Sequence, residues 1–326
     1  MVHKIHTRLK ITLLALLPCI AAVAAPKAVV KTSVAHLYSR PDFEASIETQ
    51  ELMGGTVEIL EQDGLWIKVR CNQPYDAWTS LRWLEMMDGG RLQEWLDAPK
   101  YIFTALYGSV FSAPDKDSQP ICDLVAGDVL ACSTENGRAQ RRRGWSGVLL
   151  PDGSAGWVES GSLEDKAAWE KKCLGYGRDE RIASAIGWAV KMMGIPYLWG
   201  GMSAKGFDCS GLTRFVYLMS GVRLPRNASQ QIGCGTRISI PVMPDGRFDL
   251  SVLKPGDLVF FGHFTDGKGS TADTQCKPKV THVGLYLGDG RMIHSSHLVR
   301  INSLVRGSAD CYENVHLLVG ACRIVQ

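Results

Sequence analysis

Cys209 is the residue of this sequence whose surroundings best suit nucleophilic chemistry. A glycine-rich stretch precedes it, and apolar residues at helical spacing follow it as far as Gly221, so we expect Cys209 at the start of a helix. The unpaired N–H groups and the positive dipole end of a helix favour a thiolate at that position. A structural cysteine would lie among apolar neighbours, whereas Asp208 and Ser210 flank this one. We therefore interpret Cys209 as a nucleophile and Asp208 as the N-cap of its helix.

A thiol nucleophile needs a general base, and two histidines further along the chain are candidates. His282 and His294 lie on expected strands at 281–288 and 291–296, which a tight Asp-Gly turn joins. A hairpin of this kind brings the two rings side by side. His282 would then accept the thiol proton, and His294 would hold the ring of His282 in the productive tautomer.

The polar, glycine-rich stretch 263–279 separates this hairpin from the strand expected before it. We expect the stretch to form a mobile loop at the rim of the cleft. His263 stands at its start and is an alternative base, although it leads into the loop rather than lying on a strand.

Two copies of one β-rich pattern precede this region. The aromatic-Ser-x-Pro run at 38–41 recurs at 111–114, and the tryptophan-containing run at 75–79 corresponds to 154–158. Many short strands separated by turns are typical of small barrels, so we expect two barrels of one kind.

A charged segment after the second copy predicts a linker or the start of a helix, and apolar spacing predicts a helix over 181–193. The expected fold class is α+β. We divide the chain into a signal peptide, two barrels and a C-terminal domain, at 1–25, 26–97, 98–163 and 164–326.

The first 25 residues predict a secretory signal rather than part of the fold. Basic residues up to Lys10 precede an apolar run at 11–20, and small residues follow at 21–25. The apolar run is too short to span a bilayer. Cys19 raises the alternative of a lipidated terminus, but the residues before it are not the small ones that such a site needs. We expect an exported protein, periplasmic or secreted, without membrane insertion.

The composition limits the other partners. A formal charge of +3 in 326 residues is too mild to indicate nucleic acid. The basic run 141–143 could meet an anionic polymer, although three charges in a polar loop are usually only solvated. The sequence has no Cys-x-x-Cys pair and no His/Cys cluster with zinc spacing. We expect no metal, no cofactor and a monomer.

The sequence has ten cysteines, and an odd number remains once Cys19 is removed with the signal. One thiol is therefore unpaired, and Cys209 is the best candidate. The others could form disulfides after export or serve as small buried apolar residues: Cys71, Cys122, Cys132, Cys173, Cys234, Cys276, Cys311 and Cys322.

Sequence motifs around the candidate site resemble those of the NlpC family of cell-wall cysteine peptidases. The resemblance covers about residues 181–326, and its blocks follow in the expected order: Tyr-x-Trp-Gly-Gly at 197–201, Phe-Asp-Cys-Ser-Gly-Leu at 207–212, Pro-Gly-Asp-Leu-Val-Phe-Phe at 255–261, His-Val-Gly-Leu-Tyr-Leu-Gly-Asp-Gly at 282–290 and Ile-His-Ser-Ser at 293–296. It implies a papain-like core in which Cys209, His282 and His294 are the catalytic triad. Tyr197 would lie near the nucleophile and help stabilise the oxyanion, or else be a half-buried packing residue.

The two β-rich copies resemble tandem bacterial SH3-like domains. This arrangement is similar to that of γ-D-glutamyl-L-diamino acid endopeptidases, which implies murein peptides with a free N-terminal L-Ala as substrate. The resemblance assigns Asp208 and Ser210 to the substrate amine and its neighbouring backbone. It also implies an acid and a tyrosine from the barrels, for which Asp76 and Tyr107 are candidates. The chain has Asp-Ala-Trp where the family usually has Glu-Gly-Trp, and the alternatives are a surface aspartate and a core tyrosine.

Three functional hypotheses follow. The first is a peptidase that cleaves L-Ala-γ-D-Glu-diamino acid peptides, because carboxylates around an ammonium group select a free amino terminus. The second keeps the fold but makes the protein an acyltransferase or an endopeptidase that cleaves cross-links. The third is a non-catalytic protein whose barrels bind the wall.

Overall fold

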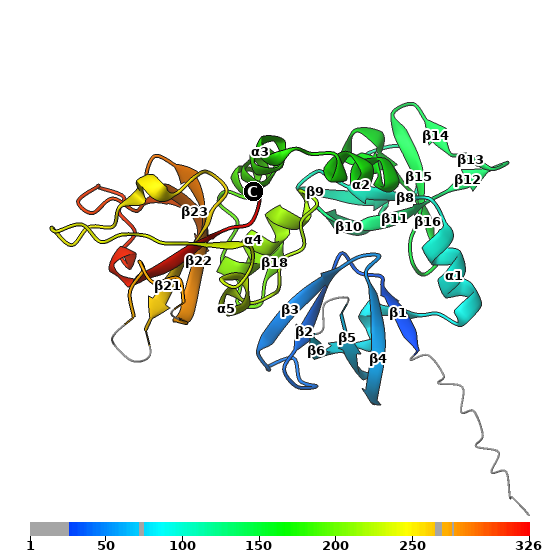
Figure 1. Ribbon diagram of the computed structural model, residues 1–326. Helices are drawn as coiled ribbons and strands as arrows, with labels where there is room; N and C mark the ends of the chain where they lie inside the picture. Colours follow the sequence, from blue (N-terminus) through cyan, green and yellow to red (C-terminus); the bar gives the residue numbers. More distant parts are fainter. Residues whose placement is uncertain (1–25, 72–74, 265–268, 276) are drawn as a thin grey trace, which may run out of the picture.

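The computed structural model describes residues 26–71, 75–264, 269–275 and 277–326. The expected signal peptide, Cys19 and Cys276 lie outside the described residues. Two antiparallel β-sheets come first in the chain, and a helical segment and a third sheet follow (Figure 1). The helices are α1 (Gly89–Asp97), α2 (Lys166–Leu174), α3 (Arg178–Lys191), α4 (Cys209–Leu218) and α5 (Ala228–Gln231). Among the described helices, none has the length and apolar content that a membrane span requires.

The first sheet has seven strands in the order β3-β2-β6-β5-β4-β1-β7. Alternating apolar residues on these short strands bury one face as a small core. The strands are β1 (Lys27–Val30), β2 (Val34–Tyr38), β3 (Ile47–Leu52), β4 (Thr56–Asp63), β5 (Trp66–Arg70), β6 (Asp76–Ser80) and β7 (Leu84–Met86).

The second sheet repeats the strand order of the first as β10-β9-β16-β15-β11-β8-β17, and an additional strand, β14, pairs with β15. Tyr38 pairs with Trp78 in the first sheet, and Phe111 pairs with Trp157 at the equivalent position of the second. The internal repeat is therefore confirmed as one topology used twice, whereas its SH3-like character stays a prediction. The strands, with an added hairpin, are β8 (Lys100–Phe103), β9 (Tyr107–Phe111), β10 (Pro120–Val125), β11 (Val129–Cys132), β12 (Thr134–Glu135), β13 (Arg138–Ala139), β14 (Arg141–Arg142), β15 (Trp145–Leu149), β16 (Ala155–Glu159) and β17 (Leu163–Asp165).

The two sheets contact each other at two equivalent glycine turns, one after β3 at Gly54 and one after β10 at Gly127. Gly54 follows β3 with a φ of 81°, and a Cβ there would lie 2.4 Å from the carbonyl oxygen of Val129. The backbone N–H of Val129 donates to the carbonyl of Met53 at 3.0 Å. The buried carboxylate of Asp128 accepts from the N–H of Met53 at 3.2 Å. The two sheets are thus joined by backbone contacts that leave no room for a side chain at Gly54.

The substitution Gly54→Ala tests this contact. An alanine with positive φ costs about 1–2 kcal/mol, and forcing its Cβ against Val129 adds roughly 1–3 kcal/mol. The matched control is Gly64→Ala, since Gly64 has a φ of 58° with open space around its Cβ. Chemical denaturation should give a clearly larger loss of unfolding free energy for Gly54→Ala. Equal losses for the two variants would show that the turn contact contributes nothing.

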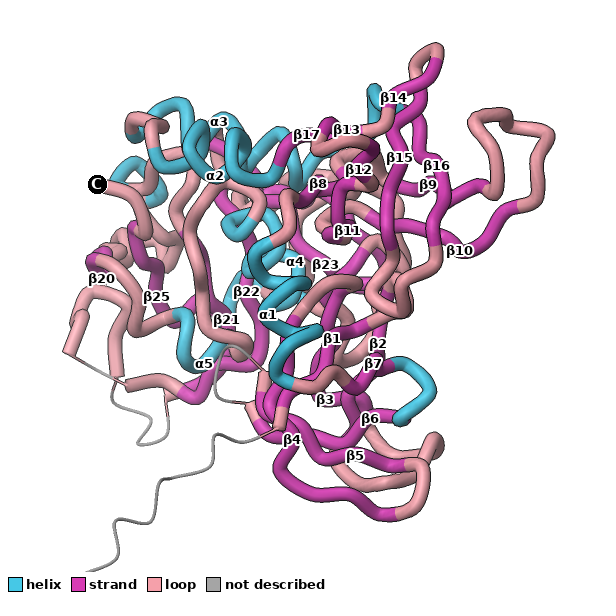
Figure 2. The backbone as a smooth tube through the Cα atoms, turned by 90° about the vertical axis from the view of Figure 1, so that its right-hand side faces the viewer, coloured by secondary structure: helices cyan, strands magenta, loops and turns pink. Residues whose placement is uncertain are grey.

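The C-terminal sheet is antiparallel, with the order β20-β25-β21-β22-β23-β24. Figure 1 places α4 between this sheet and the N-terminal sheets, and α4 packs on β22 and β23. Figure 2 shows the same elements from the right-hand side of that view. The strands are β20 (Thr236–Ile238), β21 (Leu258–His263), β22 (Lys279–Gly288), β23 (Arg291–Ser296), β24 (Leu298–Ser303) and β25 (Leu318–Arg323), with the small pair β18 (Met202–Ser203) and β19 (Gly206–Phe207) before α4.

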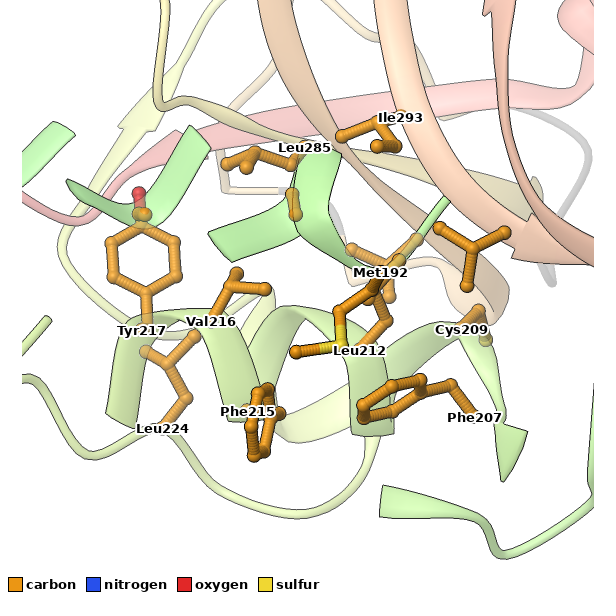
Figure 3. Close-up of a cluster of buried hydrophobic side chains, with 14 of the residues drawn as sticks. Met192, Phe207, Cys209, Leu212, Phe215, Val216, Tyr217, Leu224, Leu285 and Ile293 are labelled. Carbon is orange, nitrogen blue, oxygen red and sulfur yellow. The ribbon is translucent and has the colours of Figure 1, made fainter. Parts of the chain in front are cut away.

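One hydrophobic core runs through all three parts of the molecule. Its side chains around α4 include Phe207, Leu212, Phe215 and Val216, and Cys209 lies at the N-terminus of the helix (Figure 3). Leu52 and Val34 of the first sheet, and Ile102, Val125 and Ala126 of the second, belong to the same cluster. The position of α4 is therefore fixed by the N-terminal sheets as well as by its own domain.

The expected α+β class is confirmed, and α3 covers most of the helix expected over 181–193. The charged segment before it contains the separate helix α2. The disulfides that export would allow are not formed, because all eight described cysteines are free thiols. Several of them are buried in different cores, as small apolar residues are.

Candidate active site

Cys209 is the first residue of α4, as the sequence predicts. Asp208 is the N-cap, and its carboxylate accepts from the backbone N–H of Gly211 at 2.7 Å. A Cβ on Gly211 would lie 2.0 Å from the carbonyl oxygen of Gly201, so only glycine lets the preceding loop approach the helix so closely. Cys209 is 8% exposed. The loop and the helix thus present a nearly buried thiol.

A cleft of about 470 Å³ opens at Cys209. The first sheet, the loop before α4, α4 itself, α5 and β22 all contribute to its walls. Its lining residues are Glu48, Tyr75, Tyr197, Trp199, Gly200, Asp208, Cys209, Ser210, Arg226, Asn227, Ala228, Ser229, Val280 and Thr281. The thiol therefore faces a space large enough for a short peptide.

The two candidate histidines form a hydrogen-bonded chain with a third residue. His282 Nε2 lies 2.8 Å from His294 Nδ1, and His294 Nε2 lies 2.9 Å from Asn302 Oδ1. The side-by-side arrangement expected of the hairpin is confirmed. Asn302 is the addition, and sequence reasoning missed it. It lies on β24, diagonal to His294 on the neighbouring strand, where side chains of one sheet face meet.

The donor and acceptor of each hydrogen bond in this series follow from the bond that Asn302 makes to the backbone. The Nδ2 group of Asn302 donates to the carbonyl oxygen of Asp310 at 2.8 Å, so Asn302 Oδ1 accepts the N–H of His294 Nε2. His294 Nδ1 is then unprotonated and accepts the N–H of His282 Nε2. This leaves His282 Nδ1 without a proton. The backbone N–H of Val283, the next residue, points to the Cys209 sulfur, so the candidate base lies on the strand that contacts the thiol.

Burial keeps both partners neutral at rest. Burial and the charge of Asp208 raise the pKa of the Cys209 thiol to about 12, against the N–H groups of Val283 and Ser210. Burial and the neighbouring His294 lower the pKa of His282 to about 3. The resting pair is therefore a thiol and a neutral imidazole rather than the thiolate that the helix end was expected to favour. Such a pair requires that a base take the thiol proton during attack, and His282 stays the predicted base.

The variant Asn302→Ala tests the direction of the hydrogen bonds from Asn302 through His294 to His282. It leaves the His294 Nε2–H without its acceptor and removes the tautomer preference of His282, so kcat should fall by roughly tenfold or more with little change in KM. Asn302→Asp keeps an acceptor for His294 and should retain more activity than Asn302→Ala. If the two variants, both folded by circular dichroism, lose the same activity, the role of Asn302 is only structural.

The pH profile tests the neutral pair. A base with a lowered pKa stays unprotonated as the pH falls, so kcat/KM should hold between about pH 7.5 and pH 5. An ordinary imidazole would lose half its activity near pH 6.5. Ultraviolet absorbance at neutral pH should also show no more thiolate in the protein than in Cys209→Ala. Either a midpoint near pH 6.5 or excess thiolate would contradict the arrangement.

Asp208 forms a buried ion pair that the sequence did not indicate. Its oxygens accept from Arg226, from the N–H groups of Gly211 and Gly200, and from the hydroxyl of Ser210 at 3.2 Å. A carboxylate offers about four acceptor positions, so Asp208 is saturated. Arg226 is 3% exposed and also donates from Nε to the hydroxyl of Thr49, on β3, at 3.0 Å.

Tyr197 lines the cleft beside Cys209 and is 36% exposed. Burial raises the pKa of Tyr197 to about 12, helped by Cys209 and Asp208. Its hydroxyl therefore remains a proton donor at neutral pH, as an oxyanion-stabilising group must be. The oxyanion role stays a prediction.

The structure does not bring Asp76 and Tyr107 into the cleft. Asp76 is exposed and forms a bidentate ion pair with Arg70, 2.7 Å on each side. The guanidinium of Arg70 lowers the pKa of Asp76. Tyr107 donates its hydroxyl to the carbonyl of Ala204 at 2.7 Å and lines a separate hollow of the second sheet. The rival base, His263, is exposed at the end of β21, whereas His282 is partly buried and hydrogen-bonded to His294.

The acid and the tyrosine that reach the cleft from the first sheet are Glu48 and Tyr75. The hydroxyl of Tyr75 donates to the carboxylate of Glu48 at 2.7 Å. Tyr75 directly precedes Asp76, the first residue of β6. Glu48 and Tyr75 thus occupy the cleft in place of the expected Asp76 and Tyr107. In the sequence, nothing distinguishes Glu48 from other polar residues on alternating strands, so its position in the cleft could not be predicted.

No group of residues suited to a metal occurs within the described ranges. The groups of the site are those that acyl transfer uses: a thiol, an imidazole with a free nitrogen, and donors around the start of α4.

Residues 194–311 match the model of the NlpC/P60 family. The chain is 27% identical to a protein named dipeptidyl-peptidase 6 from Lysinibacillus sphaericus, over 85% of this chain and 91% of that one. It is 28% identical to a gamma-D-glutamyl-L-lysine dipeptidyl-peptidase from Bacillus cereus, over 78% and 68% of the two chains. A probable endopeptidase p60 from Listeria innocua shares 39% identity over 39% of this chain and 20% of its own length.

A crystal structure of an NlpC/P60 family protein from Bacillus cereus superimposes with a TM-score of 0.68 at 22% identity. The alignment covers 92% of this chain and all of that one. At this identity the likeness speaks for the fold, and it extends over the N-terminal sheets as well as the C-terminal domain.

Proposed function

We propose that the chain, whose residues 194–311 match the NlpC/P60 family, hydrolyses the γ-D-glutamyl-L-diamino acid bond of murein peptides with a free N-terminal L-Ala. The chain is a cysteine peptidase of peptidoglycan peptides. The finer proposal concerns which bond is hydrolysed and which terminus of the peptide the enzyme recognises. The observation that carries it is a cleft lined by Cys209 and by Glu48 of the first sheet, with the hydrogen-bonded pair His282–His294 on the strands β22 and β23.

The reaction follows from the site geometry. The Cys209 sulfur attacks the carbonyl carbon of the γ-glutamyl bond while its proton passes to His282 Nδ1. In this proposal, N–H groups at the start of α4 and the hydroxyl of Tyr197 stabilise the oxyanion, which the position of Tyr197 in the cleft lining supports. The proton then passes from His282 to the leaving amine, and a thioester of the γ-glutamyl group remains on Cys209. Water gives a proton to His282 and attacks the thioester carbonyl; the carbon–sulfur bond then breaks, His282 returns the proton to the Cys209 sulfur, and the acid is released.

Selection of a free amine is supported by the carboxylate groups around the cleft. Asp208 is saturated by Arg226 and backbone donors, which leaves little capacity for a substrate ammonium. Glu48 accepts one hydrogen bond, from Tyr75, among the described residues. A half-buried carboxylate of this kind binds an ammonium group well and an acetylated amine poorly. We therefore propose Glu48, in place of Asp76, as the group that reads the amino terminus.

The N-terminal sequence supports export, and we propose that the enzyme acts outside the cytoplasm. The basic, apolar and small-residue sections of 1–25 are the support for this part of the proposal.

The tripeptide L-Ala-γ-D-Glu-diamino acid tests the function directly. The enzyme should release the L-Ala-γ-D-Glu dipeptide, and Cys209→Ala should release none, as chromatography of the products will show. The N-acetylated tripeptide and intact sacculi serve as comparison substrates and should be cut far more slowly. Faster cleavage of sacculi than of the tripeptide would favour the cross-link-cleaving alternative, and activity in Cys209→Ala would contradict the mechanism.

The variant Glu48→Gln tests the reading of the amine. Loss of a charge-assisted hydrogen bond of about 1.5–3 kcal/mol should lower kcat/KM for the free tripeptide by roughly ten- to hundredfold. Cleavage of the N-acetylated tripeptide should change little. Glu44→Gln is the matched control, because Glu44 is exposed on the turn before β3. Equal losses on both substrates would mean that Glu48 does not contact the amine.

A further inference from the structure

A second cavity, of about 330 Å³, lies where the three parts of the molecule meet. Its lining comes from the glycine turn after β3, the end of α1, the start of β8, and Arg214 and Leu218 of α4. Buried apolar side chains such as Met53, Met202 and Leu224 form part of its walls. The cavity is separate from the cleft at Cys209, since the two share no lining residue.

Positive charge dominates this cavity. Its charged lining residues are four cations and one acid: Lys100, Lys166, Arg214, Arg223 and Glu51. Lys166 pairs with Glu170, and Lys100 donates to the carbonyl oxygens of Trp95 and Ala98. The cavity therefore has more cationic groups than its single carboxylate balances.

Two of the cations have no direct partner in the described part of the chain. Neither Arg214 nor Arg223 forms a hydrogen bond or a salt bridge with another described residue. Glu51 acts on both only through its charge. Burial and the neighbouring Arg226 and Arg223 lower the pKa of Arg214, against the charge of Glu51. Guanidinium groups are planar donors suited to oxyanions, and here their donors are unused.

We propose that this cavity is a binding site for a phosphate group, held by Arg214 and Arg223 with Lys100 and Lys166 around it. A dianion matches the excess of positive charge better than a single carboxylate does. The volume admits a small phosphate ester as well as the free ion. Glu51 is the opposing charge, and burial raises the pKa of Glu51, which reduces its repulsion of an anion.

A bound phosphate would connect the turn of the first sheet to the helix that carries Cys209. Arg214 lies on α4, and Gly54 and Gly55 of the turn line the same cavity. A bound anion would therefore contact both the first sheet and α4, and would stabilise their relative position. This inference does not depend on the proposed peptidase specificity.

Isothermal titration of the full chain at constant ionic strength tests the site. The probes are inorganic phosphate, pyrophosphate and glycerol phosphate, with acetate as a monocarboxylate. Phosphate-bearing probes should bind and acetate should not, and stronger binding of glycerol phosphate than of free phosphate would identify an ester as the natural source. Absence of phosphate binding, or equal binding of acetate, would overturn the proposal.

Arg223→Gln and the double variant Arg214→Gln/Arg223→Gln locate the binding. Affinity for pyrophosphate should fall at least tenfold in the double variant and by a smaller factor in Arg223→Gln, whose exposed position spares the fold. Arg306→Gln, an exposed arginine of the C-terminal domain, is the control and should bind as the parent does. Retained affinity in Arg223→Gln and in the folded double variant would place any phosphate elsewhere and contradict the site.

Discussion

The buried ion pair between Asp208 and Arg226 is the interaction on which the arrangement of the site depends. Asp208 caps α4 and holds the N–H of Gly200 in the preceding loop, while Arg226 reaches Thr49 of the first sheet. A buried charge is tolerated only when it is paired, and removing one partner costs about 3–5 kcal/mol. The Asp208 carboxylate, together with Arg226, therefore fixes the relative positions of the thiol, the preceding loop and the N-terminal sheet.

The histidine side is held in the same way from the opposite end. The carbonyl of Asp310 orients Asn302, Asn302 orients His294, and His294 orients His282. The ring of Tyr312 stacks on that of His282, with ring centres 5.5 Å apart. Each partner is neutral in this poorly solvated cleft, so charge develops only when a substrate carbonyl is present to receive the sulfur.

The local patterns of the sequence predicted the elements well but not the long-range polar partners. The helix starting at Cys209, the His282–His294 hairpin and the repeated sheet follow from periodicity and turns. Asn302 and Glu48 are single polar residues on alternating strands, and only the fold shows what they face. The expected thiolate failed because a helix end contributes at most about 2 kcal/mol, which burial of the sulfur outweighs.

The central claim is that the polarity of the Asn302–His294–His282 chain makes His282 Nδ1 the base for Cys209. Side-chain nitrogen NMR of the free enzyme at neutral pH tests it most directly, with the His282 signals assigned by their loss in His282→Gln. The account predicts a neutral ring with a protonated Nε2 and an unprotonated Nδ1. A proton on Nδ1, whether in the other tautomer or in an imidazolium, would contradict it.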